Sequence, residues 1–114
     1  MHYAFLISNG MKINLKFTNL DPSPAIAEYV RSKFSSLDKL VEKFDAEGAV
    51  LADVEIARTT KHHHKGPVFR AEINLQLPKK IIRAEHEDWD VRVAIDQMRH
   101  KLQREIVKYK ETHA

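Results

Sequence analysis

The chain has 114 residues, of which 43% are apolar and 31% are charged. This length and composition indicate one globular domain and exclude a disordered chain. Cysteine is absent, which excludes disulfides, thiolate metal sites and cysteine nucleophiles and fits a reducing compartment. No segment approaches the roughly 20 apolar residues that a membrane span needs. We therefore expect a cytoplasmic protein without a membrane partner.

The positive charge belongs to the second half of the chain. The formal net charge is only +3, which by itself is a weak indication of a polyanionic partner. Residues 1–60 hold seven basic and eight acidic side chains, whereas residues 61–114 hold twelve and eight. Any partner attracted by positive charge should therefore meet elements that form after residue 60.

Residues 1–10 contain a short apolar run that Asn9-Gly10 ends. The run lacks the basic flank and the length of a signal peptide. Two interpretations remain, an extension, tag or alternative start, which we favour, or an additional short edge strand. We place the functional domain at residues 11–114.

A strand and a helix open this domain. Residues 11–17 alternate between apolar and polar side chains, which predicts a half-buried strand. Ser23 can cap a helix, and Pro24 suits its first position. Apolar residues then recur at helical spacing and predict one helix that ends near Phe44. They are Ile26, Val30, Phe34, Leu37, Val41 and Phe44.

Three more strands and a long helix follow. The strands are expected at 50–58, 68–77 and 81–85, and their short connections favour antiparallel pairing. Asp88 or Asp90 can cap the final helix, which should run from about Val91 to Lys110. The fold class is therefore α+β in the order β-α-β-β-β-α. We expect a four-stranded sheet with both helices packed on one face.

The final helix carries two basic rows beside its apolar stripe. Arg92, Arg99 and Lys110 line one border, and Lys101, Arg104 and Lys108 lie on the far side. Such rows can follow a phosphate backbone, because each neutralised phosphate releases counterions. The alternative is a solvated helix face held by Arg92–Asp96 and Lys101–Glu105 ion pairs at i,i+4. Spacing alone favours the solvated face.

Three short features have both a functional and a structural interpretation. His62–His64 could bind a metal, but the usual ligand spacings are missing, so an exposed basic loop is favoured. The acidic run 85–90 could serve acid–base chemistry, although carboxylates also cap helix N-termini. Trp89 could stack on a base or partner, but packing at the domain edge is favoured. We expect no metal site and no catalytic residue.

Co-linear stretches of the chain resemble a known family. These stretches are 11–14, 23–26, 83–85 and, most specifically, Asp90-Val91-Arg92-Val93-Ala94-Ile95-Asp96 with the following Lys101-Leu102, Arg104 and Lys108-Tyr109-Lys110. The pattern is similar to that of the ribosome hibernation promoting factors. This family includes the ribosome-associated inhibitor A proteins and is also labelled sigma-54 modulation protein. The resemblance covers about residues 11–110 and points to a short form.

The resemblance implies a double-stranded-RNA-binding-like domain on the small ribosomal subunit. Such a domain lies in the channel for messenger RNA and tRNA and suppresses translation by occupancy in stationary phase or stress. It favours inactive ribosomes or ribosome pairs, the latter together with a separate ribosome modulation factor. The resemblance further implies ribosomal RNA as partner, no cofactor, no small-molecule substrate and a monomer off the ribosome.

The resemblance also implies which cations meet RNA. Lys33, Lys39, Lys101, Arg104 and Lys108 are carried over from the family, and Arg92, Arg99 and Lys110 are added from the helical spacing alone. The chain departs from the family in two respects. Arg92 stands where an aromatic residue is usual, and Ala27 and Ser36 stand where some relatives carry a base.

Two further hypotheses come from other classes of protein. One is a protein-interaction module that modulates a transcription regulator, as the older family label suggests. The other is a metal-dependent enzyme that uses His62–His64. A ribosome-bound factor should sediment with small subunits, a protein-interaction module should bind its partner without RNA, and an enzyme of this kind should hold a stoichiometric metal ion.

Overall fold

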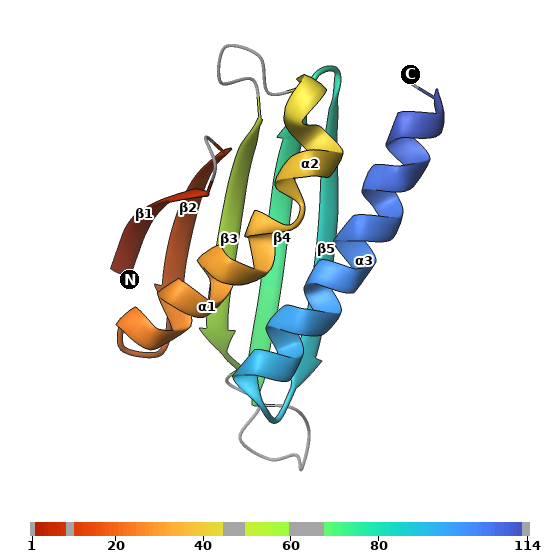
Figure 1. Ribbon diagram of the computed structural model, residues 1–114. Helices are drawn as coiled ribbons and strands as arrows, with labels where there is room; N and C mark the ends of the chain where they lie inside the picture. The colour runs from red at the N-terminus through yellow and green to blue at the C-terminus, as the bar shows by residue number, and fades with distance from the viewer. Residues whose placement is uncertain (1, 9–10, 45–49, 60–67, 113–114) are drawn as a thin grey trace.

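The computed structural model describes residues 2–8, 11–44, 50–59 and 68–112. A five-stranded sheet in the order β1-β2-β3-β4-β5 carries the helices on one face (Figure 1). The strands are β1 (His2–Ser8), β2 (Met11–Thr18), β3 (Leu51–Arg58), β4 (Phe69–Leu77) and β5 (Lys80–Asp88). The helices are α1 (Pro24–Ser35), α2 (Asp38–Val41), the 3₁₀ turn η1 (Glu42–Phe44) and α3 (Val91–Thr112). Within the described residues, no helix is both long and apolar enough to cross a membrane.

The predicted β-α-β-β-β-α order is confirmed from β2 onwards. β2 and β3 pair in parallel, and β3, β4 and β5 form an antiparallel meander. The sheet nevertheless has one strand more than the four expected, because β1 pairs antiparallel with β2 from His2↔Phe17 to Ser8↔Met11. This arrangement corresponds to the edge-strand interpretation of residues 1–10, which was the less favoured one.

The core lies between the helices and one face of the sheet. Alternate residues of β2, β3, β4 and β5 point into it, as their period of two predicts. The stripe of α3 is buried against this face and includes Ile95, Met98, Leu102 and Ile106. Burial of such stripes removes apolar surface from water and holds both helices on the sheet.

The first predicted helix is not continuous. α1 begins as expected, since Ser23 Oγ accepts from the Ile26 amide at 3.2 Å, but it ends at Ser35. The Leu37 amide donates to Phe34 at 3.0 Å, one residue short of the α-helical partner Lys33. The Lys33 carbonyl instead accepts from the Ser36 hydroxyl at 3.2 Å and from Arg99 of α3 at 2.8 Å. These competing donors break the helix although no glycine or proline is present.

α3 starts where predicted. Asp90 accepts from the Arg92 amide at 2.8 Å, and Asp88 accepts from the Asp90 amide at 3.0 Å. Asp90 is therefore the capping residue, and Asp88 supports the turn before it. β5 continues three residues beyond its predicted end at Glu85, because the ladder with β4 extends to Phe69↔Asp88.

Phe34 provides a test of the helix–sheet core. The side chain is fully buried, so Phe34→Ala should lower the free energy of unfolding by about 3–5 kcal/mol through lost burial and a residual cavity. Urea denaturation followed by circular dichroism measures this change. The control is Ile81→Ala, because Ile81 is 64% exposed and should change stability by no more than about 0.5 kcal/mol. Equal effects of the two variants would contradict the described core.

Candidate nucleic-acid interface

A basic groove runs between the edge strand β5 and the side of α3 that faces away from α1. We define the β5–α3 groove by its lining residues Arg83, Ala84, Glu85, Lys101, Arg104, Glu105 and Lys108. Four of these side chains are cationic and two are acidic, so the groove has an excess of positive charge. The three cations predicted on this row of α3 are therefore brought together.

The contacts of the groove leave much of its charge available. The Lys101 ammonium donates to the Glu85 carbonyl at 3.0 Å, and Lys108 lies 3.5 Å from the Glu105 carboxylate. The Lys108 side chain is 72% exposed, so this ion pair is weak. Arg104 is exposed and has no hydrogen bond or ion pair recorded within the described residues. An anion can therefore reach the Arg104 and Lys108 heads without breaking a strong contact.

Sequence reasoning missed three cations beside this groove. Arg83 of β5 lines it, and its Nε donates to Asn74 Oδ1 at 2.8 Å. The Tyr109 hydroxyl donates to the Pro78 carbonyl at 2.7 Å, which holds the end of α3 beside the β4–β5 turn. This turn carries the exposed Lys79 and Lys80. The predicted hairpin of the last two strands could have identified these three cations. The final helix follows this hairpin directly and was expected to pack on the same sheet, so its basic row and the cations of the hairpin could be expected to lie close together.

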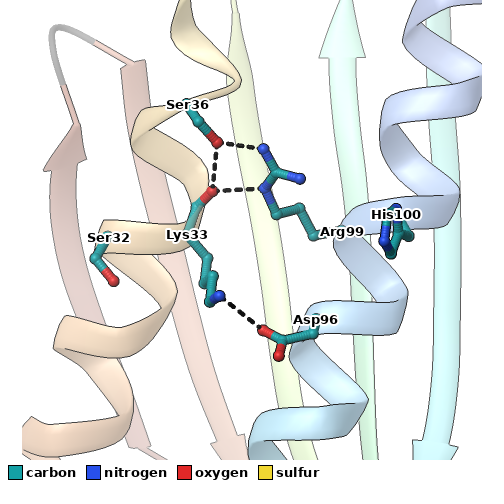
Figure 2. A pocket seen from close by; sticks show the side chains of 6 residues that line it. All are labelled: Ser32, Lys33, Ser36, Asp96, Arg99 and His100. Atoms are coloured by element: carbon teal, nitrogen blue, oxygen red, sulfur yellow. Dashed lines mark hydrogen bonds and ion pairs between the residues drawn. The ribbon is translucent and has the colours of Figure 1, made fainter.

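The opposite border of α3 faces α1 across a polar crevice. We define the α1–α3 crevice by Ser32, Lys33, Ser36, Asp96, Arg99 and His100 (Figure 2). The Lys33 ammonium lies 3.4 Å from the Asp96 carboxylate. The Arg99 guanidinium donates to the Lys33 carbonyl, to Ser36 Oγ and, at 3.0 Å, to Gln103. Arg99 thus caps the end of α1, and these contacts leave fewer of its N–H donors free to bind a partner.

Tyr29 joins the same border of α3. Its hydroxyl donates to Asp96 at 2.8 Å, and the Lys33 ammonium and Arg92 guanidinium lie 5.3 and 5.4 Å from its ring centroid. These distances suit cation–π attraction. Partial burial, the hydrogen bond to Asp96 and the charge of that carboxylate raise the pKa of Tyr29. Arg92 therefore packs on an aromatic residue of α1.

The two i,i+4 ion pairs considered for a solvated helix are wrong. Asp96 pairs with Lys33 rather than with Arg92, and Glu105 pairs with Lys108 rather than with Lys101. The partner of Asp96 comes from another helix, α1, whereas Glu105 still pairs within α3, at a spacing of i,i+3. Of the remaining predicted cations, Lys39 is exposed on α2, and Lys110 is half-buried in the last turns of α3.

The other short features have separate outcomes. His62–His64 lie outside the described residues, and within those residues no group of three or more His, Cys, Asp or Glu side chains suits a metal ion. The acidic run before α3 includes the capping Asp90, as the structural interpretation predicts. Trp89 is 58% exposed, so the expected packing at the domain edge is wrong.

Arg99 should contribute to stability more than the exposed groove cations do. Arg99→Ala removes the charged donor from the Lys33 carbonyl, and the free energy of unfolding should fall by about 1–3 kcal/mol. Arg104→Ala should change it by no more than about 0.5 kcal/mol. Parallel urea titrations compare the two variants. If Arg99→Ala were as neutral as Arg104→Ala, the capping role of Arg99 would be refuted.

The pKa of Tyr29 reports on the side chains around its hydroxyl group. Because its pKa is raised, Tyr29 should ionise above its ordinary value of 10.0. Asp96→Asn keeps an acceptor but removes the negative charge, so it should lower the pKa of Tyr29. The stability from the Tyr29–Asp96 bond should be present below the unfolded pKa and lost as the pH rises through the folded pKa. Ultraviolet titration of tyrosinate measures the shift, with Tyr29→Phe identifying the signal. An unchanged titration in Asp96→Asn would contradict the contact.

Comparison with known proteins adds the family. A family model described as sigma 54 modulation protein / S30EA ribosomal protein matches residues 13–114. A ribosome hibernation promotion factor from Lactococcus lactis is 33% identical over 88% of this chain, and one from Klebsiella oxytoca, a ribosome hibernation promoting factor, is 29% identical over 89%. The chain spans 50% of the Lactococcus protein, 45% of a Deinococcus radiodurans relative and 95% of the Klebsiella protein.

Solved structures agree on the fold. The N-terminal domain of Thermus thermophilus Protein Y superposes with a TM-score of 0.65 at 28% identity, over 83% of this chain and 94% of that domain. A ribosomal subunit interface protein from Coxiella burnetii gives the same TM-score at 22% identity, over 85% of this chain and 97% of that one. The names of the family model and of these relatives agree with the family to which the sequence pattern pointed. By its match over residues 13–114, this chain belongs to the sigma 54 modulation protein / S30EA ribosomal protein family of ribosome hibernation promoting factors.

Proposed function

We propose that this protein binds the small ribosomal subunit in the channel for messenger RNA and tRNA and suppresses translation by occupying it. It does so in stationary phase or under stress and leaves ribosomes inactive, singly or in pairs. Pairing requires a separate ribosome modulation factor. Residues 11–114 form the binding domain, with β1 as an additional edge strand. The action needs no cofactor and no small-molecule substrate, because occupancy alone excludes the translation ligands.

The observation that carries this proposal is the clustering of cations in the β5–α3 groove of a chain from this family. Ribosomal RNA presents closely spaced phosphates, and each phosphate that a Lys or Arg neutralises releases counterions into solution. Arg83 and Arg104 add planar guanidinium groups, which can bind a phosphate through two hydrogen bonds. The groove lies at an edge of the sheet, where a nucleic-acid backbone can approach.

The candidate RNA-binding residues, those predicted from sequence and those added by the structure, divide into two groups, and Arg99 belongs to neither. Arg104, Lys108 and Lys101 form the central contacts, and Arg83, Lys79 and Lys80 extend them along β5. Lys33 of α1, Lys39 of α2 and Arg92 and Lys110 of α3 form a second set outside the groove. In this second set the Lys33–Asp96 ion pair and the Arg92–Tyr29 contact must loosen before a phosphate can be bound. Arg99 acts through its neighbours as a positioning residue.

Charge reversal in the groove tests the proposed function. Arg104→Glu with Lys108→Glu should lower affinity for small subunits at least about tenfold, because two phosphate contacts become repulsive. The slope of log K against log salt should become less steep by about 2, one for each contact. Co-sedimentation with purified small subunits over a salt series measures both quantities.

The matched control is Lys12→Glu with Arg58→Glu, which changes the net charge equally at two exposed residues outside the β5–α3 groove and the α1–α3 crevice. This control should bind small subunits nearly as well as the parent protein. Equal losses in both double variants would leave only a general charge effect and refute the groove. Sucrose-gradient profiles with the purified protein then distinguish single from paired ribosomes. Unaltered profiles and continued translation in a cell-free system would refute suppression by occupancy.

The alternative function, modulation of a transcription regulator, predicts a different result. A protein partner would be retained after nuclease treatment, and its binding would lack the steep salt dependence of a phosphate contact. Tight, salt-tolerant binding to a transcription regulator together with weak binding to small subunits would favour this alternative.

A further inference from the structure

The outer edge of β5 carries backbone groups that no strand of the described sheet uses. β5 ends the strand order and pairs only with β4, on its inner side (Figure 1). In an antiparallel ladder, alternate residues direct their N–H and C=O groups to the same side. The Glu85 carbonyl accepts from Lys101 of α3 at 3.0 Å, so Glu85 directs these groups away from β4. By the same alternation Ile81, Arg83 and Glu87 also direct theirs outward.

The β5–α3 groove adjoins this edge on the helix side of the sheet. Its α3 wall holds Lys101, Arg104 and Lys108. Ala84 of β5 also lines the groove and belongs to the core, so it lies on the helix side. Side chains of a strand alternate between the two faces of a sheet. A strand added beside β5 would therefore place every second side chain in the groove, next to the three cations of α3.

We propose that β5 accepts an extended polypeptide segment with acidic residues at every second position, which adds to the sheet as an antiparallel strand. Its backbone pairs with the outward N–H and C=O groups of Arg83 and Glu85. Its carboxylates meet Lys101, Arg104 and Lys108 in the groove. Strand addition derives affinity from main-chain hydrogen bonds and specificity from alternate side chains. The free edge supplies the first contribution, and the cationic groove supplies the second.

The exposed Ile81 side chain supports a polypeptide occupant. Ile81 is 64% exposed near the start of β5, and its neighbour Ile82 is buried in the core. Ile81 therefore lies on the helix-free face of the sheet. A phosphate backbone gains nothing by covering an isoleucine. An apolar or β-branched side chain on the same face of an added strand would cover it and form a stabilising cross-strand pair.

The contact between Lys101 and Glu85 favours an acidic strand over a neutral one. The Lys101 ammonium covers the outward carbonyl of Glu85, and a lysine at a free edge hinders unspecific strand pairing. A carboxylate in the groove offers this ammonium a charge-assisted hydrogen bond, which is stronger than a bond to a neutral carbonyl. Lys101 can then release the carbonyl to the added strand. A neutral strand has no group that would replace the contact it must break.

The acidic segment and RNA would compete, because both need the α3 cations of the groove. This competition rests on the proposed function, whereas peptide binding to the edge of β5 does not. A polypeptide of this kind would act as an antagonist that releases the protein from ribosomes. If the protein bound the peptide but not small subunits, only the proposed function would fail. If it bound small subunits but not the peptide, only the strand-addition site would fail.

Labelled peptides test the added strand directly. The probe is a capped peptide as long as β5 in which Glu and Thr alternate, and fluorescence anisotropy measures its affinity for the full chain. We expect saturable binding. A peptide with the same residues in two blocks should bind about fivefold more weakly, because half of its carboxylates would face away from the cations. Equal affinities would mean that the protein responds only to net charge, and the site would be refuted.

N-methylation distinguishes strand pairing from charge attraction. In the antiparallel register the Glu side chains share a face with Ala84, so the Thr N–H groups point to β5 and the Glu N–H groups point away. Methylating the Thr amides should lower the affinity at least about tenfold through lost hydrogen bonds. Methylating the Glu amides should leave it nearly unchanged, although both peptides keep the same charge. Equal binding of the two, or a loss confined to the Glu-methylated peptide, would refute antiparallel strand addition.

A proline tests the edge from the side of the protein. Glu85→Pro removes an outward N–H group and leaves the pairing with β4 in place, since edge strands tolerate proline where the N–H faces solvent. Peptide affinity should fall about five- to tenfold. The control is Glu85→Gln, which removes the same negative charge, keeps the N–H group and should bind the peptide at least as well as the parent chain. Equal affinities of these two variants would refute the site, and the methylated peptides decide the question if the proline unfolds the chain.

Discussion

The packing of α3 across the sheet determines where the cations of this helix lie. The buried stripe that includes Ile95, Met98 and Leu102 fixes the rotation of the helix about its own axis. Once this rotation is fixed, its basic side chains must occupy the two borders of the stripe. One border faces α1, which offers carbonyl groups, a tyrosine ring and short-range partners. The other border faces the edge of the sheet, where no further helix lies beyond β5 in the described structure.

This asymmetry explains the different contacts of chemically similar side chains. Arg99 closes α1 because the Lys33 carbonyl lies within its reach. Arg104 is exposed and directed away from α1, where β5 offers it no comparable acceptor among the described contacts. A guanidinium next to a helix terminus is used to satisfy that terminus, since unpaired carbonyls are costly. A guanidinium beside an exposed strand edge retains its hydrogen-bonding capacity for a partner.

The elements with a clear local period could be predicted from sequence, because their patterns reflect burial on one face. The interruption after Ser35 could not, since it depends on a donor from Arg99, 63 residues away from Ser36. Residues 2–8 were also difficult, because pairing with β2 is expressed in the backbone and leaves little trace in the side-chain pattern. The exposure of Trp89 was missed for a related reason, since hydrophobicity predicts burial only on average.

The sequence predicted which side of α3 carries the candidate site, but it did not predict which residues of other elements lie beside it. Helical spacing placed Lys101, Arg104 and Lys108 on one side of α3, and the groove brings them together. It could not identify Arg83, because β5 and α3 become neighbours only in the folded sheet. It also assigned Asp96 to Arg92, whereas Lys33 of another helix is the true partner. A helical wheel describes one element in isolation, and ion pairs depend on the elements packed beside it.

The parallel pairing of β2 with β3 has a consequence for the order in which the chain folds. The strands β3, β4 and β5 and the helix α3 follow one another in sequence and contact their immediate successors, so they can assemble from local contacts. β2 must instead wait until the crossover through α1 and α2 is complete before Thr18 can meet Ala57. During synthesis β1 and β2 are made first, yet the apolar face of β2 gains its lasting cover only when later segments arrive. We therefore expect the C-terminal half to form first and β2 to be the strand whose apolar side chains stay uncovered longest while the chain is still growing.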